Sequence, residues 1–297
     1  QASARTMSSL GLLQEIRHAI SNLNPDEVRR TADRPLAIGL IAASAAGAEA
    51  MEDFLVPRQI SRERRMELMQ AVHRVGEPGT PSEYHLVLYE EQLPPRRDGF
   101  RYYHAHPQRT VREVLEEHEE LGLPLGRLFP PFRKPVVDRV IHTVAKENAL
   151  FALATALPNV IPSLVQLPWA IGEFASDTAF LTMNQIRMAF LVAAASDAPI
   201  GYREQKAQIA SIIAGAFGWR ALARELVGKV PMGGGLIPKG AVAYAGTYVV
   251  GMSLERFHRF GYGLTHEEKR EAYDYALRKG KGVSQLLVAG LKKVDAA

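Results

Sequence analysis

The chain has 297 residues, enough for one large domain or two of ordinary size, and its formal net charge at pH 7 is +4. It contains no cysteine, which excludes a disulfide framework, a thiolate metal site and a cysteine nucleophile, and which fits a reducing compartment. The small basic excess is not the strongly basic composition of many nucleic-acid-binding proteins. Gln1 to Leu10 carry one arginine and no long apolar stretch, so we expect no signal peptide there.

Basic residues nevertheless gather at a few places along the chain. Acidic residues interleave with most of them, so we predict solvated faces, with contact to anionic lipid or RNA as the alternative. The basic clusters are Arg62, Arg64 and Arg65; Arg96 and Arg97; and Lys269, Arg270, Arg278, Lys279, Lys281, Lys292 and Lys293.

Residues 1–33 are predicted to form two helices. Apolar side chains recur every three or four positions from residue 10 to residue 24, which is typical of an amphipathic helix. Asn24 is expected to cap a second helix, which starts at Pro25 and reaches about Ala32.

Residues 34–121 are predicted to form a small, eroded α/β unit, because apolar or β-branched runs alternate with helical patterns. A capping box of Thr110 and Glu113 marks the start of its last helix. The expected strands are Leu36–Ala42, Tyr84–Tyr89 and Phe100–Ala105, and the expected helices are Ala43–Phe54, Ser61 to about Val75, and Val111–Leu121.

Residues 122–135 are predicted to be a proline-rich linker and the domain boundary, since four prolines there should break any helix. Residues 136–297 are predicted to form an apolar helical domain with charged C-terminal helices. In this domain Ala243, Thr247 and Gly251 form a small-residue seam, and Thr265 with Glu268 forms a capping box. Helices are expected over 136–157, 177–196, 203–229, 240–252, from Thr265 onward, and separately over 283–294.

The stretch Ala149–Gly172 has no charged residue for 24 positions, whereas a helix needs only about 20 residues to span a bilayer. Pro158, Pro162 and Pro168 interrupt it, so a broken or re-entrant hairpin, or two buried helices, is expected rather than a simple span. The residues predicted to contact a membrane or partner are Leu150, Phe151, Leu157, Ile161, Leu164, Leu167, Trp169 and Trp219.

The first predicted strand and helix stand where a nucleotide-binding loop would lie. A Walker A loop needs a glycine, four residues, and then Gly-Lys-Ser or Gly-Lys-Thr to hold phosphates and magnesium. The matching register gives Ala42, Gly47, Ala48 and Glu49, so the lysine and hydroxyl are absent and Glu49 would repel phosphate. We therefore predict no nucleotide and no cofactor, and this segment is either an ordinary strand-to-helix turn or the relic of a phosphate loop.

Histidines and carboxylates provide two further candidate sites. His104, His106 and His118 could bring three imidazoles together, but no carboxylate is spaced to join them, so solvated or capping histidines are predicted and no metal.

Glu173 and Asp177 lie one helical turn apart beside the apolar stretch. With Asn184 and Arg187 they are predicted to form a structural polar network that fixes helix register. The alternative is an enzyme of unrecognised type that uses Glu173 and Asp177 as an acid/base pair in an apolar pocket.

Four short segments carry a resemblance to the YcjF-like family of bacterial domains of unknown function, over residues 128–258. They are Asn148-Ala149, Ala156-Leu157-Pro158, Thr182–Met188 and Gly215–Arg220. In that family an apolar helical domain, often predicted to enter the inner membrane, tends to follow an Era-like GTPase domain. The resemblance therefore implies that the N-terminal unit is similar to a degenerate GTPase. The Asn-Lys-x-Asp motif is absent, and Tyr89-Glu90-Glu91-Gln92 stands where Asp-x-x-Gly would follow the second strand.

Together these patterns predict a mainly α protein that acts as a non-catalytic scaffold on a membrane or on a partner protein, including copies of itself. Attachment is expected to be peripheral or re-entrant at the cytoplasmic face of the membrane. Neither nucleic acid nor nucleotide is an expected partner.

Overall fold

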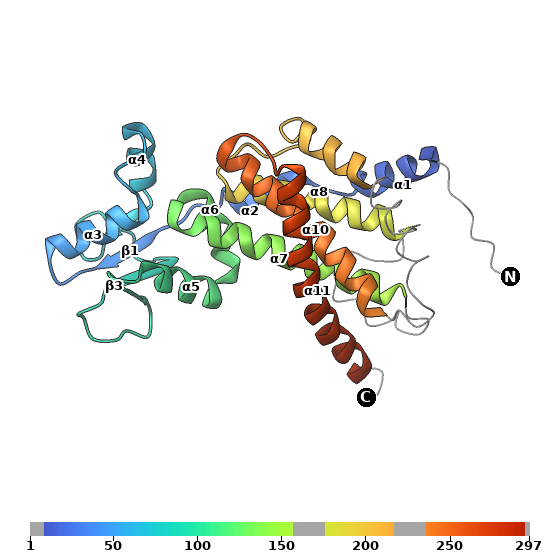
Figure 1. The fold of residues 1–297 in the computed structure, drawn as a ribbon. Coiled ribbons are helices and arrows are strands. Elements are labelled where there is room, and N and C mark those ends of the chain that lie inside the picture. Colours follow the sequence, from blue (N-terminus) through green and yellow to red (C-terminus); the bar gives the residue numbers. More distant parts are fainter. Residues whose placement is uncertain (1–8, 157–175, 217–235, 295–297) are drawn as a thin grey trace. The chain divides into compact units, whose positions relative to one another are not determined.

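The computed structural model describes residues 9–156, 176–216 and 236–294 (Figure 1). The protein is mainly α-helical with one small parallel sheet, which confirms the predicted fold class. It divides into two compact units. The α/β unit comprises Glu27–Asp138 and Ala193–Pro199, and the helical unit comprises Gln1–Asp26, Arg139–Val192 and Ile200–Ala297.

Four parallel strands form the sheet of the α/β unit, in the order β2-β1-β3-β4. They are β1 (Ile38–Ile41), β2 (Val72–Arg74), β3 (Leu86–Glu90) and β4 (Phe100–Tyr102). Gly39 pairs with His73 on one side and with Val87 on the other. The chain order reverses between β1 and β3, so the crevice outside the carboxyl ends of these two strands is where a sheet of this kind would bind a ligand.

Strand β2 was not predicted from the sequence, which favoured one helix from Ser61 to about Val75. The helix α4 (Arg62–Met69) is shorter, and the chain then extends to pair with β1. The Ile38 amide donates to the Ala71 carbonyl, and the Val75 amide donates to the Leu40 carbonyl. Pairing with a buried strand outweighs local helix propensity in this segment.

The connections that follow β2 and β3, residues 75–85 and 91–99, contain no helix. The first crosses the sheet above Gly39, where an added Cβ would lie 2.9 Å from Val75 and 3.0 Å from Tyr84. Parallel sheets are normally covered by helices on both faces. The absence of crossover helices here leaves a groove of about 950 Å³ beside β3, β4 and α5.

Helices α2 (Pro25–Ala32), α3 (Ala45–Leu55) and α5 (Pro107–Glu117) form close to the predicted positions. The predicted cap of α5 is wrong, because Thr110 lies inside the helix. Its hydroxyl donates to the Arg101 carbonyl at 3.0 Å and accepts from the Tyr103 amide at 3.1 Å, so it ties the helix to β4. Pro107 at the first position of the helix provides the start signal instead.

The predicted linker over residues 122–135 is wrong, because this segment is helical. A short 3₁₀ turn (Glu119–Leu121) leads into α6 (Gly122–Leu128), and α7 (Pro130–Ala154) follows. Pro130 and Pro131 occupy the first turn of α7, where an amide donor has no partner within the helix. Pro135 lies in the second turn and removes a single hydrogen bond.

The helical unit contains α1 (Ser9–Ser21), most of α7 and α8 (Asp177–Ala195), a helix over 206–216, α10 (Leu236–Phe260) and α11 (His266–Val294). The Thr265 capping box is present, since the Thr265 amide donates to Glu268 at 2.8 Å. The two helices predicted after Thr265 are one continuous helix.

Glycines and other small residues let α7, α10 and α11 pack closely, as the predicted seam implies. An added Cβ at Gly251 would lie 2.7 Å from Ile141, and one at Gly280 would lie 3.0 Å from the Ala241 carbonyl. Tyr244 is completely buried at this crossing.

The predicted contact residues have mixed outcomes. Phe151 belongs to the core, where its ring stacks on Phe180 at 3.8 Å, so its prediction as a contact residue is wrong. Leu150 is half-buried. The other six lie outside the described residues, namely Leu157, Ile161, Leu164, Leu167, Trp169 and Trp219.

Candidate functional site

A carboxylate of the chain itself lies at the point where the strand order reverses. Three residues separate the end of β1 from the start of α3, and Ser44 caps that helix by accepting from the Gly47 amide at 3.0 Å. Glu90, the last residue of β3, accepts from the Ala43 amide at 2.7 Å. A Cβ added at Gly47 would collide with this carboxylate, so Glu90 lies directly against the first turn of α3.

This geometry differs from a phosphate loop in two respects. Gly47, Ala48 and Glu49 lie inside α3, so the three-residue turn is too short to wrap around phosphates. The amino end of a helix attracts an anion, and here the anion belongs to the chain itself. The described residues thus form an ordinary strand-to-helix turn closed by Glu90.

Replacing Glu90 with alanine is expected to destabilise the α/β unit by about 0.5–1.5 kcal/mol, because the Ala43 amide exchanges its carboxylate acceptor for water. Glu90→Gln keeps an acceptor oxygen and should cost less. Urea denaturation measures both. Calorimetry with magnesium and GTP or ATP should give no binding for either variant or for the unmodified chain, and micromolar affinity would contradict this interpretation.

The groove beside β3 and β4 has a mixed polar lining. The Arg101 guanidinium lies 5.9 Å from the centre of the Tyr89 ring, and its Nε is buried without a hydrogen-bond partner among the described residues. The basic and acidic side chains that line the groove are Arg96, Arg97, Arg101, Asp98, Glu113, Glu116 and Glu117. This balance of charge does not select one class of ligand.

The three histidines considered as metal ligands do not form a cluster. His118 lies 3.1 Å from Glu120, and its ring meets Phe100 edge-on, while His104 stands edge-on to Tyr102. Within the described ranges no three histidine or carboxylate side chains lie close enough together to hold a metal ion.

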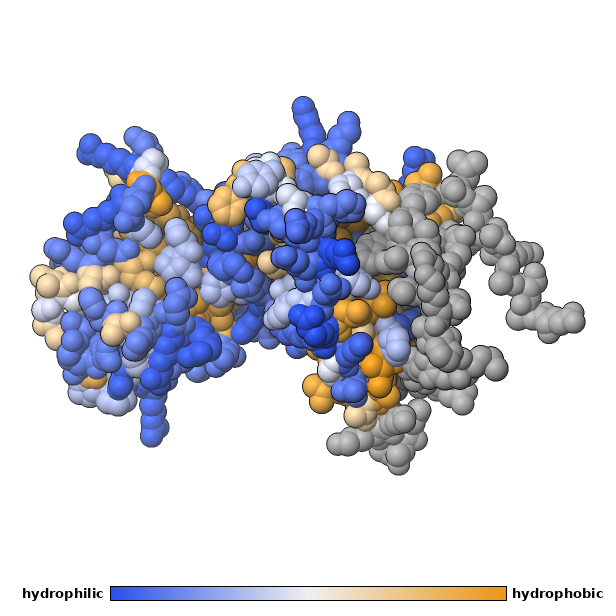
Figure 2. Space-filling model, viewed as in Figure 1, coloured by the Kyte–Doolittle hydropathy of each residue, from blue (hydrophilic) through white to orange (hydrophobic). Residues whose placement is uncertain are grey.

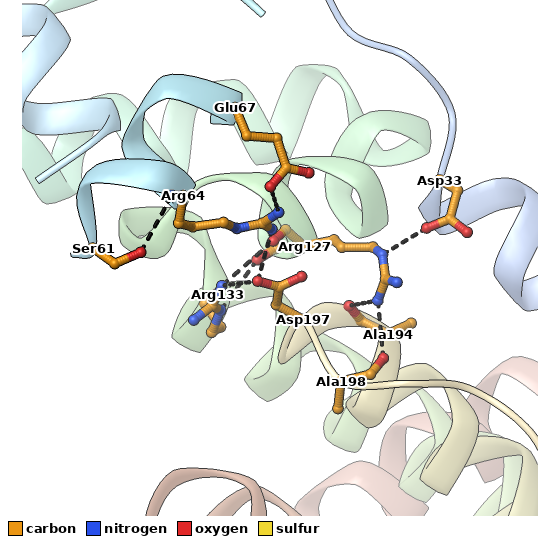
Figure 3. A network of polar contacts seen from close by, with 10 residues as sticks. Asp33, Ser61, Arg64, Glu67, Arg127, Arg133, Ala194, Asp197 and Ala198 are labelled. Carbon is orange, nitrogen blue, oxygen red and sulfur yellow. Dashed lines mark hydrogen bonds and ion pairs between the residues drawn. The ribbon is translucent and has the colours of Figure 1, made fainter. Parts of the chain in front are cut away.

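A cluster of arginines surrounds Asp197 in the α/β unit (Figure 3). Arg64 pairs with the Asp197 carboxylate at 2.7 Å and with Glu67 at 2.7 Å, while Arg133 approaches Asp197 at 3.6 Å. Burial lowers the pKa of Arg133, and the neighbouring Arg64 acts in the same direction. Arg64 was predicted to be solvated, but its side chain is only 30% exposed, and sequence reasoning had no signal for this cluster.

Arg127 holds the chain on the other side of this cluster (Figure 3). It pairs with Asp33 at 2.7 Å and donates to the carbonyls of Ala194 and Ala198, the latter at 3.0 Å. These carbonyls lie at the C-terminal end of α8, where the last acceptors of a helix need external donors. The arrangement anchors the end of α8.

Asp197 adopts a left-handed backbone conformation, with φ of 59°, directly after α8. The amide of Ala198 donates to the Ala193 carbonyl at 2.9 Å and that of Asp197 donates to the Ala194 carbonyl at 3.2 Å, which is a Schellman motif. Glycine usually occupies this position because the conformation is unfavourable for other residues. The two arginine contacts explain why aspartate is present instead.

Substitutions at Asp197 should separate the ionic contribution from the backbone strain. Asp197→Asn tolerates the left-handed conformation but removes both ion pairs, each of which contributes about 0.5–1 kcal/mol when partly exposed. Asp197→Gly removes the same pairs but relieves the strain, so it should be destabilised less than Asp197→Asn. Thermal unfolding at low and high salt tests the order, and an asparagine variant as stable as the unmodified chain would show that the pairs contribute nothing.

A buried polar network joins α7 and α8 in the helical unit. Arg187 pairs with Glu147, and its Nε donates to the Asn184 side-chain carbonyl at 2.8 Å. The Asn184 amide donates to Glu147 at 3.0 Å and to Asn148 at 2.9 Å. The Arg187 and Glu147 side chains are only 14% and 16% exposed, so the pair satisfies charges that water does not reach freely.

The network continues into α10 through Thr247. The Thr247 hydroxyl accepts from Asn148 at 2.8 Å and from Gln185 at 3.3 Å, and donates to the Ala243 carbonyl at 2.9 Å. Three helices therefore have one register fixed by hydrogen bonds, as predicted for Asn184 and Arg187. Glu147, Asn148 and Thr247 were not predicted as members of this network, although Asn148 lies in the first of the four family-like segments.

Asp177 does not belong to this network, so that part of the prediction is wrong. It is the first residue of α8, two turns or about 10 Å along the helix from Asn184. Its carboxylate accepts from Lys239 at 2.8 Å and from Thr155 at 3.1 Å, and is 38% exposed. Glu173 lies outside the described residues.

An apolar groove of about 1160 Å³ lies in the helical unit among α8, the helix 206–216, α10 and α11. Gln208 lines it, and its Oε1 is buried without a partner in the described parts of the chain. The rim is charged. The apolar lining comprises Ile212, Val249, Val250, Leu254, Phe257 and Leu264.

Among the described residues, α8 is the one helix long and apolar enough to cross a membrane by length and composition. Most of its apolar window, 78%, is buried inside the protein, as in the core helices of many proteins. Asn184, Gln185 and Arg187 lie on this helix and already have partners. The helix therefore gives only weak support for a membrane span.

Burial of His258 in α10 predicts a pH-dependent stability, because burial lowers the pKa of its imidazole. The unfolded chain binds the proton more readily than the folded chain does. The contribution of His258 to the free energy of unfolding is therefore fully present above the ordinary histidine pKa of about 6.5, and it is lost as the pH falls through the lower pKa of the folded state. His258→Phe should flatten this dependence in urea denaturation at stepped pH. If the free energy of unfolding changed equally with pH in His258→Phe and in the unmodified chain, the prediction would be contradicted.

Comparison of the chain with protein-family models, with curated proteins and with solved structures gave no match.

Proposed function

We propose that the chain is a non-catalytic scaffold that attaches to a membrane or to a partner protein through its helical unit. The observation that carries this proposal is exposed apolar surface on that unit. Leu286 is 76% exposed, and Phe260 and Tyr262 are each 55% exposed. Arg259 lies 4.9 Å from the Phe260 ring centre and Arg256 lies 5.3 Å from that of Tyr262. Apolar surface of this kind marks an interface where it forms a contiguous patch.

The non-catalytic part of the proposal draws support from the α/β unit. Glu90 lies against the turn after β1, where a sheet of this order would bind a ligand. Asp177 is one half of the alternative acid/base pair. Its carboxylate forms an ion pair with Lys239 in a partly exposed position. Neither feature favours an enzyme.

We also propose membership of the YcjF-like family, with the α/β unit as a degenerate GTPase. The support is the resemblance of four segments. Two of these segments contain Asn148, Asn184 and Arg187, and a role in one buried network would give such motif residues a structural reason to be present. Attachment would then be at the cytoplasmic face of the membrane, without nucleotide or nucleic acid.

Light scattering on the purified full chain tests this function. We expect a mass above that of one chain in detergent-free buffer, because apolar surface is shared between copies or with a partner, or else aggregation that detergent prevents. A stable monomer at high concentration without detergent that also fails to pellet with cell membranes would contradict the proposal.

A further inference from the structure

The second half of α11 combines basic charge with an exposed apolar side chain. Five basic residues and no acidic residue lie between Asp274 and Asp295 in the sequence, namely Arg278, Lys279, Lys281, Lys292 and Lys293. The first half of the helix is different, since Glu267, Glu268, Glu271 and Asp274 lie among its basic residues. Positive charge is thus concentrated toward the C-terminal end of the helix.

One face of this segment packs on the core of the helical unit. Ala276, Gly280 and Ser284 are buried and recur every four residues, and Gly280 lies close against Ala241 and Tyr244. This spacing places the three residues on one side of the helix. The segment is therefore held by the core and does not need a partner in order to fold.

Other side chains of the segment are exposed to solvent. Arg278, Lys281 and Leu286 are exposed, and Leu286 is the most exposed of the large hydrophobic side chains in the described residues. Tyr275, 49% exposed, lies eleven residues before Leu286, which is about three helical turns and places both on the same side. Hydrophobic residues gather around the end of α11 on the face shown in Figure 2.

We propose that residues 275–291 of α11 bind the surface of an anionic phospholipid bilayer, with Arg278 and Lys281 among the headgroups and Leu286 and Tyr275 in the interface. Cations on a helix with exposed apolar side chains are typical of helices that lie on membranes. Nucleic acid would satisfy the cations but would not use Leu286, so the apolar residue favours lipid. This inference rests on the proposed function and specifies its partner and the element that binds it.

Co-sedimentation of the full chain with phosphatidylcholine vesicles, with or without 30% phosphatidylglycerol, tests the proposal. We expect binding to the anionic vesicles alone, weakened by salt. Arg278→Gln with Lys281→Gln should weaken it about 25-fold, since each cation near an anionic surface contributes about fivefold. Leu286→Gln should weaken it about fivefold to tenfold through lost apolar burial.

The matched control is Lys269→Gln with Arg270→Gln, which removes the same charge from the acidic half of the same helix. This control should change binding by less than about twofold, since its carboxylate neighbours already offset those cations. Circular dichroism verifies that every variant folds. An equal effect of the two double variants would overturn the assignment to this segment, and unchanged binding of Leu286→Gln would overturn lipid as the partner.

Failure of the inference and failure of the proposed function can be told apart. A chain that ignores anionic vesicles yet forms a complex larger than one chain, or pellets with cell membranes, overturns the inference and leaves the scaffold function standing. A chain that ignores vesicles and stays monomeric overturns both.

Discussion

Replacing Arg187 with methionine is expected to lower the free energy of unfolding of the helical unit by about 3–5 kcal/mol, because Glu147 is left as an uncompensated charge in a nearly buried position. The Asn184 side chain loses its main donor in the same variant. The register of α7 against α8 depends on these contacts. The loss of stability should therefore appear as a lower urea midpoint when helix content is followed during denaturation.

Asp177→Asn provides the matched control, since it breaks an ion pair on the same helix. Asp177 and Lys239 are more than one third exposed, so water screens their interaction and the expected loss is less than about 1 kcal/mol. Similar losses for Arg187→Met and Asp177→Asn would show that the buried network does not differ from a surface pair.

Replacing Gly251 with alanine is expected to destabilise the helical unit by about 1–3 kcal/mol, because its methyl group must enter space held by Ile141. An alanine in place of a helical glycine otherwise favours folding. The cost therefore measures how closely α10 approaches α7.

Gly282→Ala in α11 should have the opposite sign, because an added Cβ at that position has no neighbour within 4 Å. The expected gain is up to about 1 kcal/mol from improved helix propensity. Thermal unfolding of both variants decides the matter. Stabilisation by Gly251→Ala would mean that α7 and α10 are not in close contact there.

Much of the fold could be predicted from local sequence signals. Asn24 accepts from the Asp26 amide at 3.0 Å, as its predicted cap requires, and the Thr265 capping box starts α11. The four-residue spacing of Thr247 and Gly251 correctly indicated close helix packing. These signals depend on residues a few positions apart, and such short spacings determine where a helix begins and which side chains share its face.

The errors arose where distant residues decide the structure. The prolines of residues 122–135 were predicted to break any helix. Pro130 and Pro131, however, occupy the first turn of α7, which is the turn of a helix that tolerates proline. Val72–Arg74 became a strand through pairing with β1, which no local pattern shows.

Sites were harder to predict than elements, for the same reason. Asp177 was grouped with Arg187 because both lie on one apolar helix, but the true partner, Glu147, lies 40 residues earlier on α7. Glu90 was noted only for what it lacked as a GTPase motif. Its role in closing the turn at Gly47 depends on the sheet order, which the sequence does not state.

Membrane fractionation of cells that produce the full chain tests the proposed scaffold function. After lysis in low salt and high-speed centrifugation without detergent, we expect the chain in the membrane pellet or in a complex larger than one chain. High salt should release part of the pelleted chain, because cations contribute to its attachment. A chain that remains entirely in the supernatant as a monomer would contradict the scaffold function and the use of the helical unit as an attachment surface.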